Sequence, residues 1–271
     1  MKKVLKVILV IGLFVLFLKL NNQYIVSTHY TLQSEKIPSN FDGFKIVQVS
    51  DLHDGLFGED NSRLIKKVQK EQPDVIFITG DVIDSRRYDL QQSLGVVEQL
   101  VDLAPTYFVT GNHEVAVNEV AKIYRELEDL GVHTLKNETI PLTKGDEEIY
   151  IAGIEDPLAG YSIEKLLPQV LENTKEHYTL LLSHRPELFQ FYVWENVDAV
   201  FAGHAHGGQF RIPFLLDGTY APGQGWLPQY TAGTYEENET TMIVSRGLGN
   251  SVIQQRLFNL PEIITVTLHT E

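Results

Sequence analysis

Short apolar runs recur between residues 44 and 203, and each ends in one small residue. They read KIVQVS at 45–50, VIFITG at 75–80, TYFVTG at 106–111, YTLLLS at 178–183 and DAVFAG at 198–203. Runs of this length that are rich in Val, Ile, Leu and Phe are typical of buried strands. Helix-like stretches separate most of them, for example 61–70, 90–103 and 120–130. The alternation predicts an α/β fold around a mostly parallel or mixed sheet.

A separate apolar segment occupies residues 1–20. Lys2, Lys3 and Lys6 precede an unbroken apolar run at 7–18. As a helix, residues 4–20 would be about 25 Å long, the low end of a membrane crossing. No small-x-small cleavage site follows, so we interpret the segment as an uncleaved anchor in preference to a cleaved signal peptide. The lysines on the short N-terminal side then predict a single-pass protein of the cell membrane whose domain is extracytoplasmic.

The rest of the chain divides into two parts. Residues 21–43 are polar and mixed, and we expect a connector that could include an edge strand. No shift in composition follows, so residues 44–271 are expected to form one domain.

Net charge changes the picture of possible partners. The chain carries a formal charge of -14, with a pI of about 5.1. Such a surface repels the phosphate backbone, so nucleic acid is not an expected partner. An anionic substrate remains compatible with this charge, because bound metal ions can invert the local field. The chain has no cysteine, which excludes disulfides and thiolate metal sites.

A side chain able to bind a metal follows every apolar run directly. These residues are Asp51, Asp81, Asn112, His184 and His204. The carboxyl ends of strands in open α/β sheets form the ligand site, so we expect these side chains to converge at one edge. The small residue before each lets the chain turn sharply there.

Two pairs spaced two residues apart enlarge this set. In Asp51-x-His53 and His204-x-His206, both side chains would point to the same side of an extended segment. The seven candidates, all oxygen or imidazole nitrogen donors, exceed what one metal with an open position can use. Two metals can use them if a carboxylate bridges, and the donor types suit Mn, Fe or Zn.

The ordered blocks carry a family resemblance. Asp51-x-His53, Gly80-Asp81, the GNHE block at 111–114, His184 and the GHxH block at 203–206 occur in sequence order. This set resembles the calcineurin-like metallophosphoesterases, and most closely their membrane-anchored bacterial subgroup, with GHxHGGQ at 203–209 and VSRGLG at 244–249. Ala205 stands where that subgroup usually has Thr. The resemblance implies a four-layer α/β/β/α sandwich with a mixed-sheet core, preceded by one membrane-spanning helix.

The resemblance also implies a division of roles. One divalent metal ion would be held by Asp51, His53, Asp81 and His206, and the other by Asp81, Asn112, His184 and His204. A water activated between the two metals would attack phosphorus, and His113 would protonate the leaving oxygen. Asp84, in GDVID, resembles an Asp that orients this histidine; an Asp at the start of a helix is the alternative.

The expected activity is hydrolysis of a phosphate ester on a phosphorylated small molecule or a lipid-linked substrate. The anchor favours a phosphodiester or pyrophosphate in the membrane or envelope, while monoester, diester and pyrophosphate remain open. The alternative is a non-catalytic envelope binding protein that retains the metal site. The aromatic-rich stretch at 220–235 could wall the substrate pocket or form an ordered surface loop.

Overall fold

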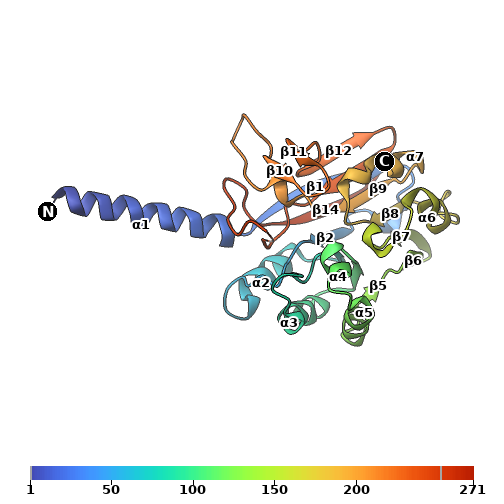
Figure 1. The fold of residues 1–271 in the computed structure, drawn as a ribbon. Helices are drawn as coiled ribbons and strands as arrows, with labels where there is room; N and C mark the ends of the chain where they lie inside the picture. The colour runs from blue at the N-terminus through green and yellow to red at the C-terminus, as the bar shows by residue number, and fades with distance from the viewer. Residues whose placement is uncertain (1, 251) are drawn as a thin grey trace.

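Two six-stranded sheets lie face to face in the computed structural model, which describes residues 2–250 and 252–271 (Figure 1). The order in the first sheet is β1 (Val26–Ser34), β14 (Glu262–Thr270), β2 (Lys45–Val49), β3 (Val75–Thr79), β4 (Thr106–Val109) and β5 (His133–Thr134). The order in the second is β12 (Gly233–Glu237), β13 (Thr240–Val244), β9 (Ala199–Ala202), β8 (Thr179–Leu182), β7 (Glu147–Gly153) and β6 (Glu138–Lys144).

Both sheets are mixed. Strands β2 to β5 run parallel, as do β7, β8, β9 and β13, whereas β14 is antiparallel to β2, β6 to β7, and β12 to β13. A short ribbon of β10 (Tyr220–Ala221) and β11 (Gly225–Trp226) lies apart from them.

Helices cover the outer face of each sheet. The first sheet is covered by α2 (Ser62–Glu71), α3 (Leu90–Val101) and α5 (Val120–Asp129), and the second by α6 (Ile163–Val170) and α7 (Phe189–Trp194). The short α4 (Asn112–Ala116) follows β4. Single turns of 3-10 helix are η1 (Ser39–Phe41), η2 (Glu59–Asn61), η3 (Pro157–Ala159), η4 (Pro186–Leu188) and η5 (His206–Gly208). The expected α/β/β/α layering is confirmed.

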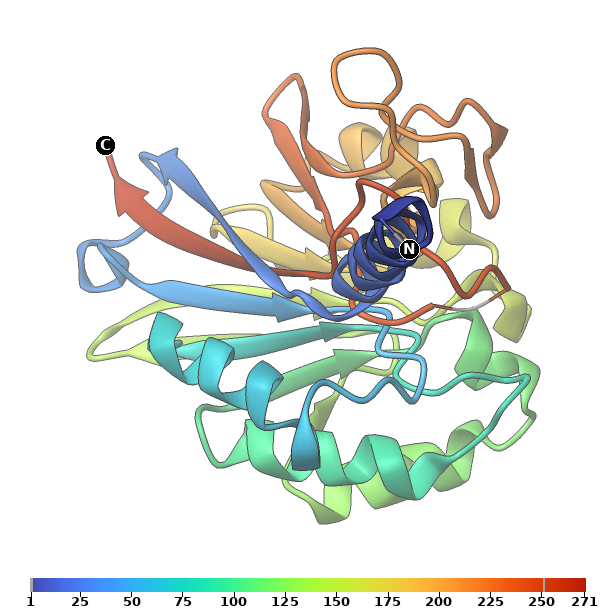
Figure 2. The ribbon, with the colours of Figure 1, turned by 90° about the vertical axis from the view of Figure 1, so that its left-hand side faces the viewer.

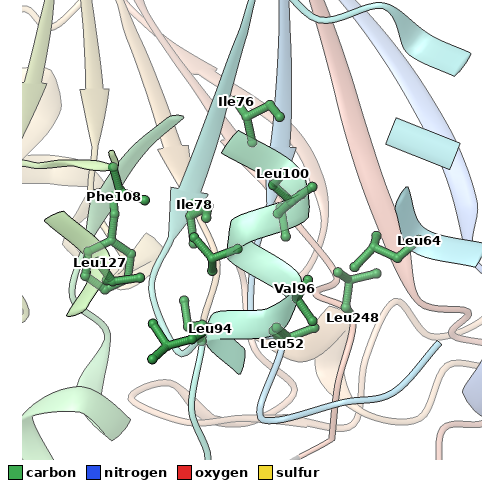
Figure 3. Close-up of a cluster of buried hydrophobic side chains, with 14 of the residues drawn as sticks. Leu52, Leu64, Ile76, Ile78, Leu94, Val96, Leu100, Phe108, Leu127 and Leu248 are labelled. Carbon is green, nitrogen blue, oxygen red and sulfur yellow. The ribbon is translucent and has the colours of Figure 1, made fainter. Parts of the chain in front are cut away.

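Alternating side chains of β3 explain why its sequence is apolar throughout. Phe77 points into the space between the sheets, where its ring contacts Phe201 with the ring centres 5.0 Å apart. Ile76 and Ile78 point the other way and pack under α3 and its Leu100 (Figure 3). A strand buried on both faces is apolar at most of its positions, which is the pattern that the five runs show.

The five runs form β2, β3, β4, β8 and β9, as predicted. The residues after these strands converge as expected, but they do so from the edges of two sheets instead of one, because β2, β3 and β4 belong to one sheet while β8 and β9 belong to the other. Apolar periodicity identifies strands but carries no information on which strands pair.

Helix α1 (Lys2–Gln23) projects from the domain with its apolar side chains exposed (Figure 1). Its length and composition suffice to cross a membrane, and it continues three residues beyond the expected end. Residues 26–34 of the expected connector form β1, which pairs with β14 from Val26–Glu262 to Ser34–Thr270. The edge strand foreseen there is therefore present.

Candidate active site

The seven candidate ligands lie together where the carboxyl ends of the two sheets meet. They are Asp51 and His53 after β2, Asp81 after β3, Asn112 after β4, His184 after β8, and His204 and His206 after β9. Six of these residues are buried and Asn112 is half-buried. Loops from both sheets thus deliver donors to one place.

Four of them form a first group. Nε2 of His53 lies 3.1 Å from Nε2 of His206 and 3.6 Å from Oδ2 of Asp81. Oδ1 of Asp51 lies 3.5 Å from Nε2 of His206 and 3.9 Å from Nε2 of His53. Two imidazole nitrogens this close need a proton or a cation between them, because their lone pairs repel each other.

Asp81 also belongs to a second group. Its Oδ2 lies 3.2 Å from Nε2 of His184, and that nitrogen lies 3.1 Å from Nδ1 of His204. Nδ1 of His184 is 2.7 Å from the carbonyl oxygen of Thr79. A carbonyl only accepts, so Nδ1 carries a proton, and Nε2 is the nitrogen that faces the site. Two donor groups therefore share one carboxylate.

Asn112 supplies an independent sign that the site suits a cation. Its Oδ1 is buried and has no hydrogen-bond partner within the protein. A buried oxygen without a partner costs free energy unless something else satisfies it. An oxygen donor beside carboxylates and imidazoles is a suitable environment for a divalent metal ion.

Burial sets the charge of the histidines. It lowers the pKa of His53 and of His204 well below the ordinary value, which favours the neutral form that metal binding requires. Burial alone would lower the pKa of His184 as well, but the Asp81 carboxylate raises it to about 10. Burial would raise the pKa of Asp81, yet His184 and His53 hold it well below its usual value.

Five of the seven candidate ligands have a left-handed backbone. The φ angles are 51° at Asp51, 49° at His53, 52° at Asp81, 64° at His204 and 48° at His206. Such conformations cost about 1–3 kcal/mol each in residues other than Gly and cluster at functional sites. The expectation that each pair lies on an extended segment is therefore wrong, because the chain folds back sharply after each strand. The left-handed turns aim these side chains at the centre.

A glycine precedes His204 for a steric reason. A Cβ atom on Gly203 would lie 2.0 Å from Oγ of Ser50 and 2.5 Å from Oδ2 of Asp51. The backbone of the loop after β9 is therefore in direct contact with side chains that follow β2. In addition, the His204 N–H donates to the Asp51 carboxylate at 3.1 Å.

Glu114 joins the loops after β3 and β4. Its carboxylate accepts the backbone N–H groups of Gly111 at 2.7 Å, Asp81 at 2.9 Å and Ile83 at 3.2 Å. Burial and the nearby Asp81 carboxylate raise the pKa of Glu114 to about 7. Its location agrees with a supporting role and leaves the metal-facing positions to its neighbours.

His113 lies beside the two groups and is held by a backbone donor. The N–H of Ser85 donates to Nδ1 of His113 at 2.8 Å, so a neutral ring carries its proton on Nε2. Nε2 lies 4.0 Å from Oδ2 of Asp81. Oδ1 of Asp84 is 3.5 Å from Nδ1, and this carboxylate accepts from the N–H of Arg86 and from Nε of Arg87 at 2.7 Å. Asp84 thus shapes the turn that presents the Ser85 N–H.

Sequence reasoning missed two arginines. Nη1 of Arg185 lies 2.9 Å from Nε2 of His204, and its Nε donates to Asp156 at 2.5 Å. Arg185 directly follows the candidate ligand His184 in the sequence, and this position could have indicated a role at the site. Arg256 is fully buried and donates to the carbonyl oxygens of Arg246 and Gly249, which fixes the loop against Asp51. Nothing in the local sequence around residue 256 marks that role.

A cavity of about 720 Å³ opens beside the site. His113, His204 and His206 line one side of it, and Arg86 contributes a cationic side chain. The lining also includes six apolar or aromatic residues, Phe210, Tyr220, Pro222, Trp226, Val252 and Ile253. Tyr220, Pro222 and Trp226 of the aromatic stretch at 220–235 thus line the pocket, while 227–235 does not contribute to the lining.

Fold and site together define a metal-dependent hydrolase of phosphate esters. The family model of the calcineurin-like phosphoesterases matches residues 44–208, more than half of the chain. The chain belongs to this family, whose members use divalent metal ions.

Relatives extend the similarity to most of the chain. It is 32% identical over 253 residues to YkuE, an uncharacterized metallophosphoesterase of Bacillus subtilis (strain 168), covering 90% of this chain and 85% of that protein. It is 30% identical over 252 residues to a Bos taurus transmembrane protein with a metallophosphoesterase domain, covering 86% of this chain and 54% of that protein. The solved structure of TT1561 from Thermus thermophilus shares the fold, with a TM-score of 0.53 at 12% identity over 76% of this chain and 90% of that one.

Proposed function

We propose that the chain hydrolyses a phosphate ester or anhydride with two divalent cations in sites that share Asp81. The carrying observation is the pair of donor groups on either side of this one carboxylate. Asp51, His53, Asp81 and His206 would hold one cation, and Asp81, Asn112, His184 and His204 the other. When bound, Mn, Fe or Zn ions supply Lewis-acid polarisation of phosphoryl oxygens and acidify water.

His113 supplies the proton for the leaving oxygen in this proposal. Its Nδ1 accepts the Ser85 N–H, which places the proton of the neutral ring on Nε2, and the ring lines the cavity. Asp84 acts indirectly, by holding the turn at 84–87 through Arg87. The histidine therefore keeps one tautomer and one orientation, as a general acid requires.

The substrate we propose carries an apolar group, because six apolar or aromatic residues line the cavity that also contains His113. A lipid-linked phosphodiester or pyrophosphate fits both this wall and an anchored protein. We further propose that α1 spans the cell membrane with the domain outside the cytoplasm, because Lys2, Lys3 and Lys6 precede its apolar run.

Hydrolysis of bis(p-nitrophenyl) phosphate, p-nitrophenyl phosphate and inorganic pyrophosphate by the full chain in detergent tests the activity. We expect turnover that requires added Mn²⁺ or Zn²⁺ and is lost in Asp81→Asn. The matched control is Asp217→Asn, at an aspartate whose side chain is 90% exposed and that belongs to neither donor group. Stoichiometric metal without hydrolysis of any of the three substrates would favour the metal-retaining binding protein instead.

A further inference from the structure

Exposed large hydrophobic side chains gather on one side of the domain. Outside α1, the exposed large hydrophobic side chains of the described residues fall in three places: Tyr24 and Leu56 near the end of the helix, the segment 212–227 and the segment 252–258. The exceptions are Leu158, Tyr161 and Trp194. The orange segment around β10 and β11 and the red segment between β13 and β14 lie on the side from which α1 projects (Figure 1). Viewed along α1, both segments flank the helix (Figure 2). We use the name apolar rim for Leu56, Phe214, Leu215, Leu227 and Phe258.

The segment at 254–258 is fastened to the last turns of α1. Asn21 Oδ1 accepts the N–H of Phe258 at 2.7 Å, and Asn22 Oδ1 accepts the N–H of Arg256 at 2.9 Å. The rings of Phe17 and Phe258 lie 5.3 Å apart. These backbone and side-chain contacts fix the position of residues 256–258 along the axis of α1.

Phe258 lies at the level of Phe17, which belongs to the apolar run of α1. Phe17 lies six residues before Gln23, about 9 Å along the helix axis at 1.5 Å per residue. A helix that carries Phe17 into a bilayer therefore carries Phe258 to the same depth. Phe258 is 55% exposed in the protein alone, and contact with the headgroup–acyl boundary would remove that apolar surface from water.

The same side of the domain contains the mouth of the cavity. Trp226, Val252 and Ile253 are exposed, yet they also line the cavity that reaches His113 and His206. An apolar surface thus continues from the rim to the candidate catalytic histidine. A lipid tail on a substrate would find apolar contact along this whole path.

We propose that the apolar rim lies in the headgroup–acyl boundary beside α1 and holds the cavity mouth against the bilayer, so that the scissile phosphoester belongs to a lipid of that membrane. This inference rests on the proposed function, since it names the source of the substrate. The bilayer is the occupant because two residues of the rim are joined to a helix of membrane-spanning length, Phe258 through Asn21 and Phe17, and Leu56 through its carbonyl oxygen, which accepts from the side chain of Gln23. A partner protein would have to enter the lipid boundary to cover Phe258.

The absence of cysteine permits a direct measurement of depth. Single nitroxide labels at Phe258→Cys and Phe214→Cys in the full chain, reconstituted in phosphatidylcholine vesicles, should collide more with dissolved oxygen than with a water-soluble nickel chelate. Trp194→Cys, at a residue 64% exposed on α7, is the matched control and should show the reverse preference. Equal access of the chelate to all three labels would overturn the proposal, and so would shielding of the rim labels from both reagents, which indicates a protein contact.

Two substrates with the same leaving group test the consequence for activity. They are bis(p-nitrophenyl) phosphate in solution and dioleoylglycerophospho-p-nitrophenol in vesicles. The double variant Phe214→Glu, Leu215→Glu should lose about tenfold or more in rate on the lipid ester, because charge at the rim opposes membrane contact. Its rate on the soluble ester should match that of wild type, as should both rates of the control Trp194→Glu.

The two failures are distinguishable. A wild-type protein that hydrolyses neither ester contradicts the proposed function itself. A wild-type protein that hydrolyses both, with a rim variant that keeps the full rate on the lipid ester, overturns only the docking of the rim.

Discussion

Gly111 lies so close to Asp81 that a Cβ atom on it would be 2.3 Å from Oδ1 of that carboxylate. The same atom would be 2.6 Å from the backbone nitrogen of Asp81. The loops after β3 and β4 are thus in contact at the one carboxylate shared by both donor groups. A methyl group at residue 111 cannot fit unless this carboxylate moves.

Gly111→Ala should therefore lower metal content and turnover together, although residue 111 offers no ligand atom. Elemental analysis and steady-state rates measure the two effects. The control is Gly95→Ala on α3, where a Cβ would meet nothing within 4 Å. Alanine should stabilise that helix by about 0.5–1 kcal/mol and leave metal content intact. Wild-type metal and turnover in Gly111→Ala would contradict the tight fit described above.

Asp81→Ala should be the most damaging single substitution. It removes the carboxylate that lies 3.6 Å from Nε2 of His53 and 3.2 Å from Nε2 of His184, so we expect loss of both cations and of activity. Metal analysis of the purified variant checks this, with retained folding confirmed by circular dichroism. A variant that binds two cations per chain and turns over normally would show that the sites do not share this residue.

His113→Ala should behave differently, because its proposed role is proton donation. Both cations should remain bound, and turnover should fall by roughly 10²–10⁴, the range of a lost general acid. The loss should be larger for an alkyl ester than for a p-nitrophenyl ester, whose leaving group needs little protonation. Equal losses on both esters, or loss of a cation, would assign His113 a positioning or ligand role.

Chelation should destabilise the fold as well as stop turnover. Asp51 and Asp81 are buried carboxylates that a bound cation would neutralise. A cation present at a hundredfold excess over its Kd contributes about 2.7 kcal/mol to the free energy of unfolding. For a chain of this size that corresponds to a fall of roughly 5–10 °C in Tm when the cation is removed. Differential scanning calorimetry with and without EDTA measures it, and Asp81→Ala should show no such difference.

The sequence predicted the strands with two buried faces from their apolar runs, whereas it indicated the edge strand β1 only as one possibility within a polar connector. Runs such as VIFITG are apolar throughout because β3 is covered on both sides. Strand β1 is a partly exposed edge strand of mixed polarity, with Thr28, His29 and Gln33 among its residues, so the polar segment was expected to be a connector. Local polarity separates core strands from loops but does not separate loops from edge strands.

The candidate ligands could be predicted because each follows a strand, whereas their backbone geometry could not. Asp and His adopt the left-handed conformation more often than most residues other than Gly, but nothing in the sequence says that Asp51 and His204 adopt it here. The close approach of loops from two sheets imposes it. Arg256 was missed for a similar reason, because two of the three partners of its side chain are backbone carbonyl oxygens, which every residue carries, and the third is Oδ1 of Asn250.

The pairing of β1 with β14 has a consequence for the order of biosynthesis. Thr28 and Glu262, which are hydrogen-bonded across these strands, are 234 residues apart. At 5–20 residues per second, β1 leaves the ribosome roughly 10–50 s before its partner strand exists. During this interval β1 has no partner strand. A strand rich in Thr, Ser and Gln is less prone than an apolar strand to pair with another nascent chain, so its polar side chains lower the risk of aggregation. The first sheet is therefore completed last, after every residue of the candidate active site has been translated.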